Sequence, residues 1–214
     1  MSPRSRFAVL ALAALCVAAP PAEAAKHHKK RSACQRLKAK HDLAPAKKVK
    51  LVSRHGELRG CVLPRGKVRH IAFREHTDTS SDDYSVRQVK GAIVLLDWSS
   101  SSQYGSRDGT TVYDIRTADA YTVASSCSPI LTGYCPTPSP QTRAASAFVN
   151  SKGQAAAALA SGSSVSITGF SSTGTPTEFD SGPSSDIPAS SLGLSGRKVT
   201  WTHSGQPKSA QLSG

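Results

Sequence analysis

The chain has 214 residues, of which 38% are hydrophobic and 19% are charged, and 27 Lys and Arg against 14 Asp and Glu give a formal net charge of +13. This composition excludes a collagen-like chain and a polytopic membrane protein, and it is more apolar than that of a fully disordered chain. We therefore expect one soluble domain with a modest core.

The first 24 residues have the features of a secretory signal peptide. Arg4 and Arg6 precede an apolar run over residues 7–19 that is too short to span a bilayer, and small residues follow at Ala22 and Ala24. Cys16 would suit a lipoprotein, but it lies within the apolar run behind a bulky leucine, so we interpret the signal as cleaved. We predict a signal peptide over residues 1–24, a disordered basic leader over 25–33 and a single all-β domain over 34–214, exported from a bacterium and either secreted or associated with the cell envelope.

Four cysteines remain after cleavage, which is an even number in a chain bound for an oxidising compartment: Cys34, Cys61, Cys127 and Cys135. We expect two disulfides. Three pairings are possible, and proximity in sequence favours Cys34 with Cys61 and Cys127 with Cys135. A metal site is the alternative, but no Cys-x-x-Cys spacing occurs.

The positive charge lies in the N-terminal third of the chain. Residues 26–74 carry 16 Lys and Arg against two acidic residues, whereas residues 75–214 carry 9 basic and 11 acidic residues. A solvated tail is one interpretation, and attachment to an anionic cell-wall polymer or another polyanion is the other. Nucleic acid is disfavoured as the partner, because no aromatic residue lies between residues 26 and 69 to stack on bases. The candidate polyanion-binding residues are Lys26, Lys29, Lys30, Arg31, Lys47, Lys48, Lys50, Lys67 and Arg69.

Short strands are predicted along most of the chain. Residues 47–52 and 66–73 alternate apolar and basic side chains, which predicts half-buried strands with a basic sheet face. Residues 86–98 contain a buried run that the serines 99–102 and Gly105 should end. A hairpin is expected over residues 110–115 and 120–124, and further strands over 144–150, 154–160, 163–170, 175–179, 198–202 and 209–212. Residues 36–41 offer the only plausible helix.

These segments repeat with a period of about 45 residues, the length of one β-propeller blade. Residues 84–124 and 143–179 each supply a four-stranded unit, and residues 192–212 begin a third. The segment 191–202, with its apolar strand, glycine turn and strand containing Trp201, resembles the blade element of secreted bacterial propeller-like proteins of unknown role. The resemblance implies a partial β-propeller of about three blades, the last completed by residues 58–63 and 67–73. A homodimer could then complete a six-bladed ring, and a β-sandwich or open barrel is the alternative fold.

No catalytic motif is visible, and we predict no catalytic residue, metal or cofactor. Residues 169–174 miss the Gly-x-Ser-x-Gly spacing by one residue, the histidines stand apart, and the acidic residues 78–83 lack a calcium-loop pattern. A sugar-binding cleft is a possible use of four aromatic residues: Trp98, Tyr113, Tyr121 and Trp201.

Two classes of function follow from the sequence. The preferred one is a non-catalytic interaction protein of the envelope, attached to an anionic polymer by its basic third. The alternative is a secreted polysaccharide hydrolase or lyase, which would need two carboxylates about 5 to 9.5 Å apart across one cleft. The candidates for such a pair are Glu75, Asp97, Asp114, Glu178 and Asp180.

Overall fold

Antiparallel strands provide most of the regular structure in the computed structural model, which describes residues 32–37, 41–42, 49–54, 56–73, 75–77, 79–129 and 142–213. The chain divides into two units, Met1–Lys30 and Arg31–Gly214, and the first lies outside the described residues. The predicted signal peptide and most of the predicted leader therefore fall outside them as well. Within the described part of the chain, no helix is both long and apolar enough to cross a membrane.

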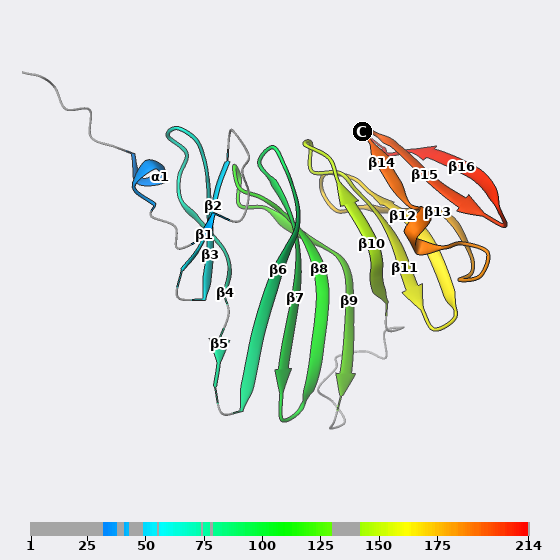
Figure 1. Ribbon diagram of the computed structural model, residues 1–214, viewed down its shortest axis with the longest axis horizontal. Coiled ribbons are helices and arrows are strands. Elements are labelled where there is room, and N and C mark those ends of the chain that lie inside the picture. Colours follow the sequence, from blue (N-terminus) through cyan, green and yellow to red (C-terminus); the bar gives the residue numbers. More distant parts are fainter. Residues whose placement is uncertain are drawn as a thin grey trace, which may run out of the picture. The chain divides into compact units, whose positions relative to one another are not determined.

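The strands form four sheets that follow one another along the chain (Figure 1). Sheet A contains β1 (His41–Asp42), β2 (Val49–Arg54), β3 (Glu57–Val62) and β4 (Arg69–Phe73). Sheet B contains β5 (Glu75–His76), β6 (Ser80–Lys90), β7 (Ile93–Ser102), β8 (Gly105–Asp114) and β9 (Ala120–Pro129). Sheet C contains β10 (Arg143–Val149), β11 (Ala155–Ser161), β12 (Ser164–Phe170) and β13 (Pro176–Pro183), and sheet D contains β14 (Gly193–Ser195), β15 (Lys198–His203) and β16 (Gln206–Gln211). The all-β prediction is confirmed.

The N-terminal strands form a sheet of their own and do not complete the last one. β3 pairs with β2 and β4, whereas sheet D consists of β14, β15 and β16. A tight turn at Gly56, with φ of 80°, brings Arg54 of β2 opposite Glu57 of β3. β4 pairs along the other edge of β3, so neither edge is left for sheet D. The prediction that residues 58–63 and 67–73 complete a third blade is therefore wrong. The described residues form four sheets, and they do not form a closed ring.

The middle strand of sheet B is buried on both faces. Leu95 of β7 belongs to an apolar cluster shared with sheet C, whereas Val94 packs with Leu51 of sheet A and Leu96 with Leu58 of sheet A. A continuous apolar run is what a strand needs when its sheet is covered on both sides. The predicted buried strand over residues 92–96 is confirmed.

In sheet C, alanines form the strand that is buried on both faces. Ala155 and Ala157 of β11 pack toward sheet B, and Ala156 and Ala158 pack toward sheet D, all four being fully buried. The small side chains allow sheet C to lie close to both of its neighbours. The sequence prediction of a strand over residues 154–160 is confirmed, although alanine favours helices, because pairing with β10 and β12 outweighs that preference.

Sheet B continues as a polar extension beyond this core. Its outer half pairs residues 80–83, 99–102, 105–108 and 126–129 across four strands, as Figure 1 shows for β6 to β9. The prediction that serines 99–102 and Gly105 end the strand is wrong. Backbone hydrogen bonds to β6 and β8 on either side keep these serines in the ladder whatever the polarity of their side chains.

Candidate functional site

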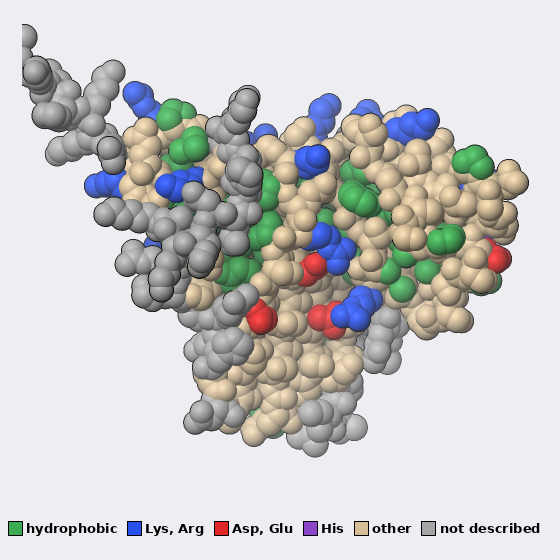
Figure 2. All heavy atoms as spheres, in the orientation of Figure 1, with side chains coloured by type: hydrophobic (Ala, Val, Ile, Leu, Met, Phe, Trp, Pro, Cys, Tyr) green, Lys and Arg blue, Asp and Glu red, His purple; other side chains and the backbone are tan. Residues whose placement is uncertain are grey.

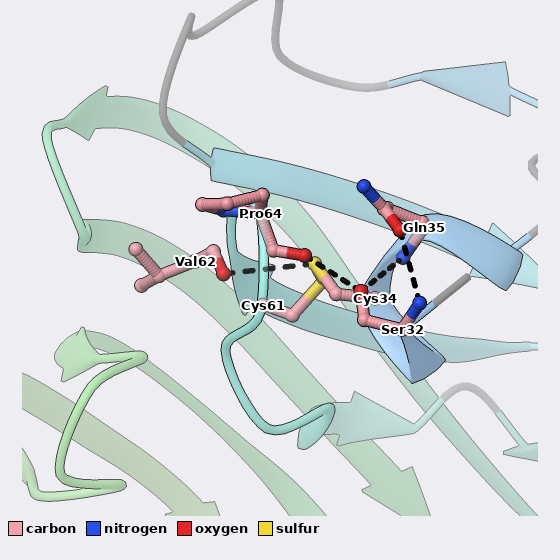
Figure 3. Close-up of a disulfide and its surroundings, with 6 residues drawn as sticks. All are labelled: Ser32, Cys34, Gln35, Cys61, Val62 and Pro64. Carbon is pink, nitrogen blue, oxygen red and sulfur yellow. Dashed lines mark hydrogen bonds between the residues drawn. A yellow bond between two sulfur atoms is a disulfide. The ribbon is translucent and has the colours of Figure 1, made fainter. Parts of the chain in front are cut away.

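A disulfide attaches the N-terminal end of the described domain to sheet A. It joins Cys34 of the short helix α1 (Ala33–Arg36) to Cys61 of β3, and both residues are fully buried. The predicted pairing of these two cysteines is confirmed. In Figure 3 the sulfur of Cys34 also faces the carbonyl oxygen of Val62, at 3.7 Å.

A capping box fixes the start of α1. The backbone N–H of Gln35 donates to the Ser32 hydroxyl at 3.2 Å, and the backbone N–H of Ser32 donates to Gln35 Oε1 at 3.0 Å. The Ser32 hydroxyl in turn donates to the carbonyl oxygen of Pro64 at 2.6 Å (Figure 3). The predicted helix over residues 36–41 agrees with the structure at Arg36 alone among its described residues, since α1 ends there, Leu37 is extended and His41 lies in β1. α1 is thus held beside the turn between β3 and β4.

The turn between β3 and β4 presents two basic side chains to solvent. The N–H of Gly66 donates to the Val62 carbonyl at 2.7 Å, and a Cβ at this position would lie only 2.3 Å from the same oxygen. Glycine is therefore required here. Arg65 and Lys67 on either side of Gly66 are exposed.

Basic side chains outnumber acidic ones over the described part of α1 and sheet A. The basic residues are Arg36, Lys50, Arg59, Arg65, Lys67 and Arg69, with Lys50 and Arg69 half-buried and the others exposed. Of the side chains described in residues 32–73, only Glu57 is acidic, and it pairs with Arg59. Among these described side chains, positive charges therefore outnumber negative ones by six to one.

The candidate polyanion-binding residues are described only in part. Lys26, Lys29, Lys30, Arg31, Lys47 and Lys48 lie outside the described residues. Lys50 of β2 lies opposite Cys61, on the face of sheet A that carries the disulfide, and Lys67 is exposed beside the β3–β4 turn. Arg69 donates from Nη2 to the carbonyl oxygen of Arg116 at 3.4 Å, which links sheet A to sheet B.

A pocket of about 440 Å³ lies between the polar extension of sheet B and the start of β10. Asp97 of β7 lines it and accepts from Arg87 Nε at 2.8 Å and from the Thr110 hydroxyl at 2.7 Å. Asp108 of β8 also lines it and accepts from the Ser126 hydroxyl. Arg143 of β10 lies 3.9 Å from Asp108.

The strand register places the acidic residues of this pocket on one face of sheet B. Asp83 and Asp108 both lie opposite Ser99, and Asp97 lies two residues before Ser99 in β7. Residues related diagonally across neighbouring strands are about 7 to 8 Å apart, so the register makes Asp97 and Asp108 near neighbours on this face. Asp97 was a candidate from the sequence, whereas Asp108 and Arg87 were not.

The other acidic candidates lie apart from this pocket. Asp114 pairs with Arg116 in the turn after β8, and Glu178 is exposed on β13. Asp180 accepts from Trp201 Nε1 at 2.7 Å and lies 2.8 Å from His203 Nδ1. Burial alone would raise the pKa of Asp180, but the hydrogen bonds from Trp201 and His203 outweigh it and hold the pKa below its usual value. The side chain of Glu75, in β5, is outside the described side chains.

The four aromatic residues of the predicted sugar cleft are not brought together. Trp98 packs in the apolar cluster between sheets A and B, and its ring lies against Gly109. Tyr113 donates to the carbonyl oxygen of His70, and Tyr121 packs at the interface of sheets B and C. Trp201 packs between sheets C and D and is 6% exposed.

The other groups considered for catalysis or metal binding form no such site in the described residues. No group of three or more His, Cys, Asp or Glu side chains in them is arranged to hold a metal ion. Ser171, in the segment considered as a nucleophile, accepts hydrogen bonds from the backbone of Thr173 and Thr175 and so closes the turn between β12 and β13. The second predicted disulfide, Cys127 with Cys135, involves a residue outside the described ones.

Comparison with known proteins gave no match to a protein-family model, to a curated protein or to a solved structure. The functional interpretation is therefore based on the geometry described above.

Proposed function

We propose that this protein is an exported, non-catalytic β-rich protein of the cell envelope or extracellular space that attaches to an anionic polymer through its basic N-terminal third. One observation carries the proposal: the described part of α1 and sheet A has six basic side chains and a single, already paired carboxylate. The disulfide and the hydrogen bond from Ser32 to Pro64 hold α1 beside the turn that carries Arg65 and Lys67.

We further propose that sheets A to D are consecutive blades of a partial β-propeller. Each sheet is an antiparallel meander, and apolar clusters join A to B, B to C and C to D face to face, as in propeller blades. The face of sheet D turned away from sheet C carries Lys198, Thr200 and Thr202. A second copy that completed a ring would dock there through polar contacts.

Co-sedimentation with purified cell-wall sacculi tests the attachment. The mature protein should pellet at low salt and be released at high salt, because exposed charge pairs are screened within about 8 to 10 Å at 0.1 to 0.15 M salt. The variant Arg36→Gln/Arg65→Gln/Lys67→Gln should pellet several-fold less. None of these three side chains has an ion pair within the described structure, so the fold should be retained.

A charge-matched control separates the basic third from net charge. Gln206→Glu with Lys208→Glu lowers the net charge by the same three units on the exposed strand β16. This control should pellet like the wild type. Equal pelleting of the wild type and the Arg36/Arg65/Lys67 variant at every salt concentration would refute the proposal.

Substitutions are preferable to truncation in this test. Sheet A covers apolar residues of sheet B, including Val94, Leu96 and Ile115. A chain that began after sheet A would expose them to solvent, and its sedimentation would report aggregation as well as binding.

A second candidate function is that of a polysaccharide hydrolase or lyase, and the pocket that contains Asp97 and Asp108 favours it. They are diagonal neighbours on one face of sheet B, and a glycosidase needs two carboxylates across one cleft. Both carboxylates accept hydrogen bonds from neighbouring side chains, so neither is arranged as a proton donor, and we rank this function second. Release of reducing ends from a panel of polysaccharides, lost in both Asp97→Asn and Asp108→Asn, would support it. No release from any of them would reject it.

A further inference from the structure

The hairpin turns at one end of the four sheets carry a shared basic surface. The strands alternate in direction from β6 to β14, so the turns after β6, β8, β10, β12 and β14 lie at one end of the sheets. β4 and β5 run on in one direction (Figure 1), so the turn after β3 lies at that end as well. We call their residues the turn end: 63–69, 90–92, 114–119, 150–154, 171–175 and 196–198. The turn end contains eight Lys and Arg and two Asp.

Side-chain hydrogen bonds to backbone carbonyls connect the turn end from sheet to sheet. At least one bond crosses each boundary, from A to B, from B to C and from C to D: Arg69 Nη2 to Arg116 O at 3.4 Å, Tyr121 OH to Gly153 O at 2.7 Å, and Asn150 Nδ2 to Gly196 O at 2.9 Å. The turns are therefore held in fixed relative positions. A surface that is already ordered loses less conformational entropy when it binds a partner.

One of the two acidic residues at the turn end is neutralised locally. Asp114 pairs with the guanidinium of Arg116. Burial would raise the pKa of Asp114, but the hydrogen bonds from Arg116 outweigh it and keep the pKa below its usual value. The exposed basic side chains that have no ion pair within the described structure are Arg65, Lys67, Lys90, Lys152, Arg197 and Lys198.

The clustering is not a consequence of overall composition. Residues 75–214 carry more acidic than basic residues, yet five of their nine basic residues lie at the turn end. Among the described residues, the turns at the opposite end carry Arg54, Glu57 and Asp186 as their charged residues. Figure 2 shows Lys and Arg side chains along the upper edge of the sheets, which is the edge of the turn end.

The chemistry of the turn end suits a partner recognised by charge alone. Its solvent-facing residues are mainly glycine, hydroxyl-bearing and charged residues. Tyr104 is the exposed large hydrophobic residue of the described chain, and it lies at the other end, in the β7–β8 turn. Membrane insertion needs apolar side chains, and binding of single-stranded nucleic acid relies on aromatic stacking. We propose that the turn end binds a linear polyanion with closely spaced phosphate groups, which lies across the turns from sheet A to sheet D.

This inference rests on the proposed function and names a larger site for it. Packed sheets lie about 10 Å apart, so a polymer that reaches from sheet A to sheet D must span about 30 Å. A short oligomer contacts one or two sheets, and a longer one contacts all four. Affinity should therefore rise with chain length and level off once the polymer spans the four sheets.

Inorganic polyphosphate of graded chain length is the probe, with binding measured by isothermal titration at several salt concentrations. Lys90→Gln/Lys152→Gln/Lys198→Gln removes one charge from each of sheets B, C and D. Each lysine that no longer neutralises a phosphate should lower the slope of log affinity against log salt by about 0.7, so this variant should lose about 2 units of slope. Its affinity should fall about tenfold at low salt and should level off at a shorter chain length. The control Gln206→Glu/Lys208→Glu should retain the wild-type slope and length dependence.

The outcomes separate this inference from the proposed function. Wild-type slope and length dependence in the Lys90/Lys152/Lys198 variant would overturn the inference, and the proposed function would survive if the Arg36/Arg65/Lys67 variant still bound weakly. Wild-type binding by both variants would overturn both proposals. Binding to anionic phosphatidylglycerol vesicles in preference to polyphosphate, or to single-stranded oligonucleotides in preference to polyphosphate, would also overturn the inference.

Discussion

The Cys34–Cys61 disulfide should stabilise sheet A by an amount that follows from its place in the chain. The two cysteines are 27 residues apart, and closing a loop of that length removes unfolded-state entropy worth about 3.5 kcal/mol at 25 °C. The Cys34→Ala/Cys61→Ala variant should therefore lose up to that free energy of unfolding. For a chain of this size the loss corresponds to a fall in Tm of about 7 to 14 °C.

Tryptophan fluorescence during urea unfolding can locate the effect, because the two tryptophans lie in different interfaces. Trp98 packs between sheets A and B, and Trp201 packs between sheets C and D. The variant is made in two backgrounds, Trp201→Phe and Trp98→Phe, each compared with its disulfide-containing parent. The Trp98 signal should move to lower urea by more than the Trp201 signal. A free energy of unfolding within about 1 kcal/mol of the parent in both backgrounds would refute the loop-entropy argument.

Three further predictions concern packing, pH and a turn. Ala157→Leu inserts a large side chain into the fully buried face of β11 and should cost about 1 to 3 kcal/mol in urea unfolding, whereas Ala145→Leu at an exposed position of β10 should change it little. The folded-state pKa of Asp180 is lowered, so the ionised side chain stabilises the fold above about pH 4, and this stabilisation is lost as the pH falls through the folded-state pKa. Asp180→Asn should therefore make the free energy of unfolding depend less on pH at acid pH. An unchanged pH dependence in this variant would contradict the argument. Gly66→Ala would bring a Cβ to 2.3 Å from a backbone carbonyl oxygen of its own turn, so it should lower Tm and weaken polyphosphate binding together, and a loss of neither would contradict the turn geometry.

Local sequence patterns predicted the strands well because each strand pairs with its neighbour in sequence. The apolar run at 92–96, the hairpin over 110–124 and the alanine strand at 154–160 all appear as expected. The apolar and polar alternation needed no knowledge of distant contacts in these cases. The Cys34 to Cys61 pairing was also accessible from proximity in the chain.

The errors arose where the partner, and not the strand, had to be predicted. Nothing in residues 58–63 distinguishes pairing with β2 from pairing with β16, and only the tight turn at Gly56 decides between them. The serines 99–102 were interpreted as a break because their side chains are polar, although the backbone ladder holds them in β7.

The pocket and the turn end were missed for related reasons. A hairpin turn at residues 103–104 would have placed Asp108 diagonally from Asp97, but that turn was interpreted as the end of a strand. Lys90 and Lys152 each precede a turn glycine with positive φ, and Arg197 follows one. The lysine-glycine signal was therefore present, but its meaning depends on the turns of different sheets lying at one end.

The polar extension of sheet B has a consequence for how this chain can change. Its strands are continuous with the buried half of the sheet, so the core strands anchor their register even though residues 99–102 contribute no apolar face. The serine side chains there lie outside the described apolar clusters, while the ladder holds the backbone beneath them. Substitutions at such positions should cost little stability, and the rigid backbone should hold the new side chains in defined positions. A new binding site could therefore be introduced on this extension by design or arise there by mutation.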